Sequence, residues 1–197
     1  MEETMDRSPL SSLDQLLREW GMTPHNWKED DNFDVLRILG LATREIYHSR
    51  VIAYLLDPKN QHGLGSEFLV RVLKKAELKQ RNSKQPVIDW GIPNDITEVD
   101  IFLEKSLDKY GRVDILVRCF GKTFLIENKV YAAESVDQVK QYRDWLENSG
   151  TKGEIIFLTP KGRECSDGKA IRMSYSDLAE CLSECLFNEQ INPFALL

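Results

Sequence analysis

The feature that most constrains the fold is a pair of alternating apolar segments joined by Phe120-Gly121. Segment 111–119 reads GRVDILVRC, and segment 122–130 reads KTFLIENKV. Apolar and polar residues alternate along both, which predicts two antiparallel strands with a tight turn between them. If the turn is centred between Phe120 and Gly121, Asp114 faces Glu127 across the hairpin.

Two carboxylates opposed in this way have Cβ atoms about 4.5–5.5 Å apart and repel each other. Proteins accept such a pair when a cation, a shared proton or a nearby lysine offsets the repulsion. Oxygen ligands at this separation suit Mg²⁺ or Mn²⁺. A solvated strand face with a Glu–Lys pair is the alternative. Alternation puts Glu127 and Lys129 on one face and Asn128 on the other, together with a predicted core face of Val113, Ile115, Val117, Phe124 and Ile126.

The hairpin lies within a mixed pattern of helices and strands. We expect helices over 10–20, 33–56, 66–78, 136–146 and 176–186, and strands over 97–103, 113–119, 124–130, 154–158 and 170–173. This order predicts an α/β (mixed α+β) protein with a central sheet covered by helices. The 197 residues suit a single domain. Its expected parts are an N-terminal helical extension (1–30), a core (33–160) and a C-terminal strand and helix (161–197).

Composition sets the expected environment. Hydrophobic residues make up 42% and charged residues 29% of the chain, as in ordinary globular proteins. No apolar run approaches the roughly 20 residues that a membrane helix needs, and the polar N-terminus does not read as a secretory signal. The four cysteines form no C-x-x-C pair. We therefore expect reduced cysteines, a cytoplasmic location and no membrane partner.

The predicted helix 33–56 carries an interrupted apolar stripe. Leu41, Glu45, His48 and Ile52 follow one another at helical spacing. Glu45 and His48 are either a hydrogen-bonded pair within the helix or a further carboxylate aimed at the carboxylate pair, with the histidine nearby. After this helix, Asp57 is expected to cap a turn, and His62 to be an exposed loop residue.

Two further polar groups are candidates for contact with a substrate. Gln138 and Tyr142 lie four residues apart on one face of the predicted helix 136–146, where an amide and a phenol can hydrogen-bond phosphate or orient a neighbouring side chain. The segment 71–84 is basic in a chain whose net charge is −6. It is either a solvated helix end or a phosphate-contacting edge, with Arg71, Lys74 and Lys75 as the candidates.

These elements together resemble the PD-(D/E)XK nuclease superfamily. The resemblance rests on three motifs, G-x-x-D (Gly111 to Asp114), E-x-K (Glu127 to Lys129) and Q-x-x-x-Y (Gln138 to Tyr142). The last is typical of the RecB-type branch. The upstream segment EIYHSRVIAYLLDPKNQHGLGSEFL resembles the corresponding sequence of a bacterial group of uncharacterised nuclease-like proteins. The resemblance spans about residues 40–160 and implies a restriction-endonuclease-like αβββαβ core. Val113 stands where the family name has proline.

The resemblance also implies roles. Asp114 and Glu127 would be metal ligands, with the carbonyl of Asn128 as a third, and Glu45 would be the helix carboxylate that many members carry. Lys129 would position or help deprotonate the attacking water. Gln138 and Tyr142 would support the site or touch the nucleic-acid backbone.

The expected function is that of a Mg²⁺- or Mn²⁺-dependent nuclease that hydrolyses phosphodiester bonds of DNA. The alternative is a nuclease-fold module that binds nucleic acid or protein and is catalytically silent or dependent on a partner, which the acidic net charge favours. A metal hydrolase of smaller phosphoesters is a third reading. RNA as substrate, endonuclease or exonuclease action, and a homodimer or partner protein stay open.

Overall fold

The computed structural model describes residues 40–41, 43–81, 89–130, 137–165 and 168–188. They belong to one compact unit that begins at Gly40. The predicted helix 10–20 and residues 33–39 lie outside the described residues. No helix in the described ranges is long and apolar enough to cross a membrane.

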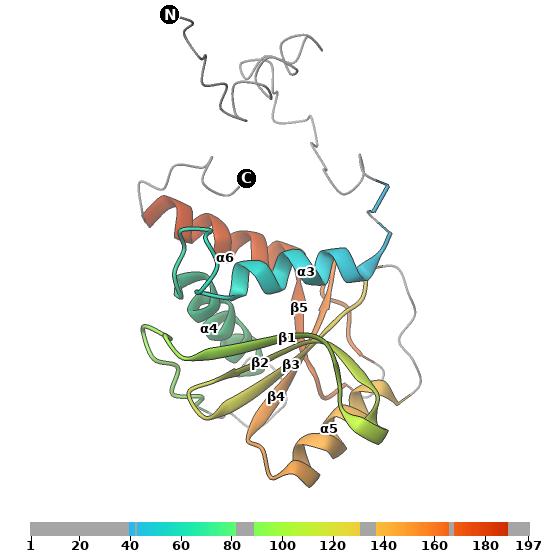
Figure 1. The fold of residues 1–197 in the computed structure, drawn as a ribbon. Helices are drawn as coiled ribbons and strands as arrows, with labels where there is room; N and C mark the ends of the chain where they lie inside the picture. The colour runs from blue at the N-terminus through green and yellow to red at the C-terminus, as the bar shows by residue number, and fades with distance from the viewer. Residues whose placement is uncertain (1–39, 42, 82–88, 131–136, 166–167, 189–197) are drawn as a thin grey trace, which may run out of the picture. The chain divides into compact units, whose positions relative to one another are not determined.

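A five-stranded mixed sheet forms the centre of this unit (Figure 1). Its strands follow the chain order, so each strand lies beside the next. The first three are antiparallel, and the last three run parallel. Parallel strands end at the same edge of a sheet, which brings the residues that follow them close together. The strands are β1 (Val99–Ser106), β2 (Arg112–Cys119), β3 (Lys122–Asn128), β4 (Gly153–Thr159) and β5 (Ile171–Ser174).

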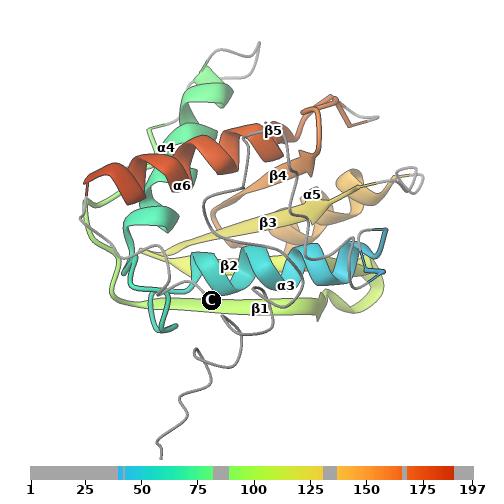
Figure 2. The ribbon, with the colours of Figure 1, turned by 90° about the horizontal axis from the view of Figure 1, so that it is seen from above.

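Helices cover both faces of the sheet. One face is covered by α3 (Glu45–Leu56), α4 (Glu67–Arg81) and α6 (Tyr175–Asn188). The opposite face is covered by α5 (Gln138–Ser149), as Figures 1 and 2 show. The predicted α/β class and the αβββαβ order are confirmed, with β5 and α6 added after them.

Two hydrophobic clusters therefore replace the single core face that we expected. One lies under α3, α4 and α6 and includes Ile115, Val117, Phe124 and Ile126, as predicted. The second lies under α5 and includes Leu116, Leu125 and Phe157. Val113 belongs to this second cluster, so its predicted place was wrong. Both faces are apolar because helices pack on both.

The predicted hairpin register is confirmed. Ile115 pairs with Ile126 and Val117 with Phe124, and one further step along the strands places Asp114 opposite Glu127. Phe120 and Gly121 both have positive φ angles, 36° and 72°. Such angles form the two-residue turn whose twist matches that of the strands. The turn thus fixes the register on which the carboxylate pair depends.

The expected helix 33–56 begins later than predicted within the described residues. Gly40 has a φ of 69°, and Arg44, directly before α3, is extended. Leu41 therefore lies outside the helix, and the stripe starts at Glu45. α4 runs on to Arg81 instead of ending near Leu78, and the hydroxyl of Ser66 bonds the loop at Asp95 and Ile96.

The loop between α3 and α4 contains a buried histidine. His62 is fully buried, so the expected exposed loop residue was wrong. Its Nδ1 accepts a hydrogen bond from Leu64 N at 3.1 Å, and its Nε2 lies 2.9 Å from the carbonyl of Asp57. The two contacts define a neutral ring that donates from Nε2. Asp57 itself forms the expected turn, because its Oδ1 accepts from Lys59 N.

Candidate active site

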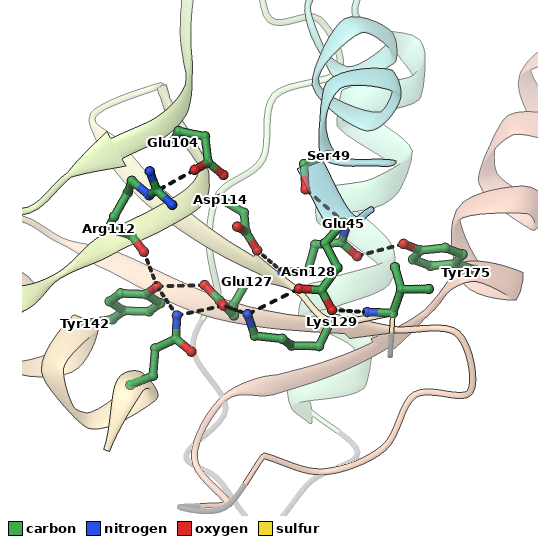
Figure 3. A network of polar contacts seen from close by, with 12 residues as sticks. Glu45, Ser49, Glu104, Arg112, Asp114, Glu127, Asn128, Lys129, Tyr142 and Tyr175 are labelled. Atoms are coloured by element: carbon green, nitrogen blue, oxygen red, sulfur yellow. Dashed lines mark hydrogen bonds and ion pairs between the residues drawn. The ribbon is translucent and has the colours of Figure 1, made fainter. Parts of the chain in front are cut away.

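The polar centre of the structure is the tripeptide Glu127–Asn128–Lys129 at the end of β3 (Figure 3). Three helices reach it, each with its first residue. Glu45 begins α3 and contacts Lys129, Gln138 begins α5 and contacts Glu127, and Tyr175 begins α6 and contacts Asn128. Helix N-termini carry partial positive charge and favour anions. The fold thus collects three such ends around one short segment.

Glu127 is the most enclosed acidic group of the site, with 1% of its surface exposed. Its Oε1 accepts hydrogen bonds from Lys129 Nζ and Gln138 Nε2, both at 2.7 Å. Its Oε2 lies 2.7 Å from the hydroxyl of Tyr142. The predicted carboxylate is therefore held by the predicted lysine and by both residues of the Q-x-x-x-Y pair.

Asp114 lies opposite Glu127 on β2 and is only partly enclosed. Its Oδ2 accepts a hydrogen bond from the main-chain N–H of Asn128 at 2.7 Å. Burial and then the charge of Glu127 raise the pKa of Asp114 from 3.8 to about 7. Burial also raises the pKa of Glu127, although its hydrogen bonds to Lys129, Tyr142 and Gln138 oppose the rise. The positive charge around the two carboxylates therefore does not compensate for their burial and mutual repulsion.

Lys129 is the cation of the site. Its Nζ lies 2.7 Å from Glu127 Oε1 and 3.6 Å from Glu45 Oε2. Burial lowers its pKa, but the contact with Glu127 and the charges of Glu127, Asp114 and Glu45 raise it further, so the net direction is upward. Lys129 is therefore charged at neutral pH. The other oxygen of Glu45 accepts from Val130 N at 2.8 Å, which fixes the carboxylate on the strand end.

Tyr142 and Gln138 form the support of Glu127. The Tyr142 hydroxyl is buried, accepts from Gln138 Nε2 at 2.8 Å, and lies 2.7 Å from the carbonyl of Arg112. With its contact to Glu127, one phenolic hydrogen faces two oxygen acceptors. Gln138 Oε1 is the one buried side-chain polar atom within the described residues that has no hydrogen-bond partner. At this end of the site, one acceptor of the Tyr142 hydroxyl receives no hydrogen from it, and Gln138 Oε1 receives none at all.

Two residues that the sequence did not single out hold Asn128. Its buried amide donates from Nδ2 to Ser49 Oγ at 3.1 Å, and its Oδ1 accepts from the Tyr175 hydroxyl at 2.8 Å. His48 packs its ring against that of Tyr175, with centroids 5.9 Å apart. His48 therefore lies beside a residue that holds Asn128, and its own role in the site stays a prediction. No sequence signal pointed to Tyr175, because it lies 47 residues after Asn128.

The predicted phosphate contacts lie elsewhere. Arg71 and Lys75 are on α4 and form ion pairs with Glu184 and Glu180 of α6, while Lys74 donates to Asn94. Arg71 also pairs with Glu67 one turn earlier on its own helix. Arg71 and Lys75 therefore join α4 to α6, and the structure does not bring any of the three cations to the carboxylate pair. Their contact with phosphate stays a prediction.

An ion pair not anticipated from the sequence flanks Asp114. Arg112, two residues before Asp114 on β2, places its Nε 2.9 Å from Glu104 Oε2 of β1 (Figure 3). Glu104 has a φ of 50°, a left-handed conformation that costs a non-glycine residue about 1–2 kcal/mol. An exposed ion pair contributes about 0.2–1 kcal/mol. The ion pair by itself therefore does not offset the backbone strain of Glu104.

The donor set fits a divalent cation. Asp114 and Glu127 supply carboxylate oxygens from adjacent strands, and the carbonyl of Asn128 is the third candidate ligand. Mg²⁺ and Mn²⁺ prefer such oxygens and are typically bound through one or two carboxylates. The described residues contain no group of three or more His, Cys, Asp or Glu side chains placed to hold a metal ion. A set of two carboxylates and a carbonyl needs no such group.

The central mixed sheet is covered by helices on both faces, and Asp114 of β2 lies beside Glu127 and Lys129 at the end of β3. A family model described as the PD-(D/E)XK nuclease superfamily matches residues 30–193. The chain therefore belongs to the PD-(D/E)XK nuclease superfamily. Searches of curated proteins and of solved structures found no match. Placement in the RecB-type branch stays a prediction.

Proposed function

We propose that the protein is a metal-dependent nuclease that hydrolyses phosphodiester bonds of DNA. The observation that supports this most is the convergence of Asp114, Glu127 and Lys129 at one strand edge, in the order that the family pattern requires. Asp114 and Glu127 would hold Mg²⁺ or Mn²⁺ together with the carbonyl of Asn128. When bound, such a cation neutralises charge at the phosphate and lowers the pKa of a coordinated water.

The chain's own residues supply the rest of the chemistry. Lys129 keeps its proton and places a positive charge beside the carboxylates, where it stabilises negative charge that develops on a phosphate. Glu45 limits the movement of Lys129 by its own contact with Nζ. Gln138 and Tyr142 hold Glu127 in one orientation, and the N–H of Asn128 does the same for Asp114. Such fixed groups cost little reorganisation during reaction.

The proposal is tested by incubating circular and linear DNA, single- and double-stranded, with Mg²⁺, Mn²⁺ or a chelator. We expect metal-dependent cleavage that is lost in Asp114→Asn and in Lys129→Ala. Two matched control variants, Asp100→Asn and Lys105→Ala, remove exposed charges of β1 and should cleave like the wild type. Nicking of circles would identify an endonuclease.

The binding-module alternative makes the opposite prediction. A chain that binds DNA but leaves every substrate intact with each metal would contradict the nuclease proposal. Cleavage that persists unchanged in Asp114→Asn would contradict the assignment of the site, since the preparation would then contain another activity. Cleavage of RNA in preference to DNA would correct the substrate class.

A further inference from the structure

Arg112 combines an exposed cation with a fixed position beside the carboxylate pair. Its side chain is 68% exposed, whereas Lys129 is 12% exposed and engaged on two carboxylates. Arg112 and Asp114 are two residues apart on β2, which places their Cα atoms about 7 Å apart. Arg112 is therefore the nearest exposed arginine along this strand to the proposed scissile position.

Both ends of Arg112 are fixed. Its carbonyl lies 2.7 Å from the hydroxyl of Tyr142, the same hydroxyl that contacts Glu127. Its Nε lies 2.9 Å from the carboxylate of Glu104, which takes a left-handed backbone conformation at that position. Strained backbone is concentrated at sites where ligands bind. Glu104 therefore orients the guanidinium next to Asp114.

The contact with Glu104 leaves part of the guanidinium available. Its closest contact with Glu104 is made by Nε, and 68% of the side chain is exposed, so much of the guanidinium faces solvent. A guanidinium has five N–H donors in a planar fork that matches the oxygens of a phosphate. The arrangement presents such a fork to solvent at one end of the site.

We propose that Arg112 binds the phosphate next to the scissile one and so holds the nucleic-acid backbone in register with Asp114 and Glu127. This inference rests on the proposed function. It places the backbone along the β2 edge of the site, and it assigns substrate binding to a residue outside the segment 71–84. Glu104 is then a positioning residue that acts through Arg112.

The test is a binding measurement that does not depend on cleavage. Fluorescently labelled single- and double-stranded oligonucleotides are titrated with the protein in Ca²⁺ by fluorescence anisotropy at several salt concentrations. Arg112→Gln should weaken binding by about tenfold and lower the salt slope by roughly one. Arg112→Lys should restore the slope, because the charge returns, while affinity stays below that of the wild type.

The matched control is Arg118→Gln, which removes another exposed arginine of β2, near the turn end of the strand and over the ring of Phe102. We expect it to leave affinity and salt slope unchanged. Wild-type affinity in Arg112→Gln would overturn the inference, and so would an equal loss in Arg118→Gln, because the effect would then report net charge. Absence of binding by the wild type would overturn it as well.

The two proposals fail in different ways. Binding that depends on Arg112 without any cleavage in Mg²⁺ or Mn²⁺ would contradict the nuclease and leave the phosphate contact supported. Metal-dependent cleavage with wild-type binding in Arg112→Gln would support the nuclease and contradict the contact. Melting curves of Arg112→Gln should match the wild type, since only an exposed ion pair is lost.

Discussion

Asp114→Asn should stabilise the metal-free protein while it abolishes metal-dependent activity. In the absence of a cation, the Asp114 carboxylate is partly buried and faces Glu127. An asparagine has nearly the same shape and keeps an oxygen that accepts from Asn128 N. The substitution removes the negative charge of Asp114, which burial and the neighbouring Glu127 make unfavourable. Proteins commonly gain stability when a strained active-site group is neutralised.

The size of the gain follows from the pKa of Asp114. A rise from 3.8 to about 7 corresponds to roughly 4 kcal/mol at most between the two protonation states. Water that reaches the partly exposed carboxylate reduces this to about 2 kcal/mol. For a protein of this size, about 2 kcal/mol raises the melting temperature by roughly 4–8 °C.

The sign of the pH dependence is fixed by the direction of the shift. Because the folded-state pKa of Asp114 is raised, the group favours folding at low pH, and that contribution is lost as the pH rises from about 4 to about 7. Asparagine does not titrate. The advantage of Asp114→Asn should therefore be largest above about pH 7 and shrink toward about pH 4.

The assay is thermal unfolding in chelator at about pH 5 and about pH 8, followed by circular dichroism. Asp100→Asn, which neutralises an exposed carboxylate of β1, is the control and should change the melting temperature little at either pH. An Asp114→Asn variant that melts at or below the wild-type temperature at about pH 8 would refute the reasoning. An equal gain at both pH values would refute it too, because the pKa shift would not be the cause.

Three further predictions concern the same site. Stabilisation of the wild type by Mn²⁺ should grow between about pH 5.5 and about pH 8, because Asp114 must lose its proton to bind the ion; a thermal shift that is independent of pH would contradict this. Tyr175→Phe should lower the free energy of unfolding by about 1–3 kcal/mol, since it leaves the buried Oδ1 of Asn128 without its donor, whereas Tyr54→Phe at an exposed position of α3 should change it little in urea titrations. Tyr142→Phe should also lower metal affinity in calorimetry, because Glu127 loses one of the groups that orient it; unchanged affinity would show that Gln138 and Lys129 suffice.

The sequence predicted the parts of the site that depend on short-range periodicity. Alternation along two strands and a two-residue turn sufficed to oppose Asp114 and Glu127, because register follows from the turn once its centre is known. Helical spacing sufficed for Gln138 and Tyr142, which meet at 2.8 Å.

The parts that were missed depend on tertiary contacts or on backbone conformations without a residue signature. Ser49 and Tyr175 reach Asn128 from 79 and 47 residues away in the chain. Glu104 has a positive φ angle, and glutamate, unlike glycine or asparagine, gives no indication of such a conformation in the sequence. His62 looked like a loop histidine because loops are usually exposed, and its burial depends on two main-chain partners.

The charge balance of the site explains why so many groups converge on one tripeptide. Glu45, Asp114 and Glu127 carry three negative charges, and a phosphodiester adds a fourth. Lys129 supplies one positive charge, and a helix N-terminus acts as roughly half a charge. The first residues of α3, α5 and α6 all contact the tripeptide, so the three helix ends together contribute at most about one and a half. A deficit of roughly one and a half charges remains when substrate is present, which one divalent cation covers and a monovalent ion does not. The same arithmetic predicts that Na⁺ or K⁺ will not replace Mg²⁺ or Mn²⁺ in cleavage, even at concentrations that saturate the site.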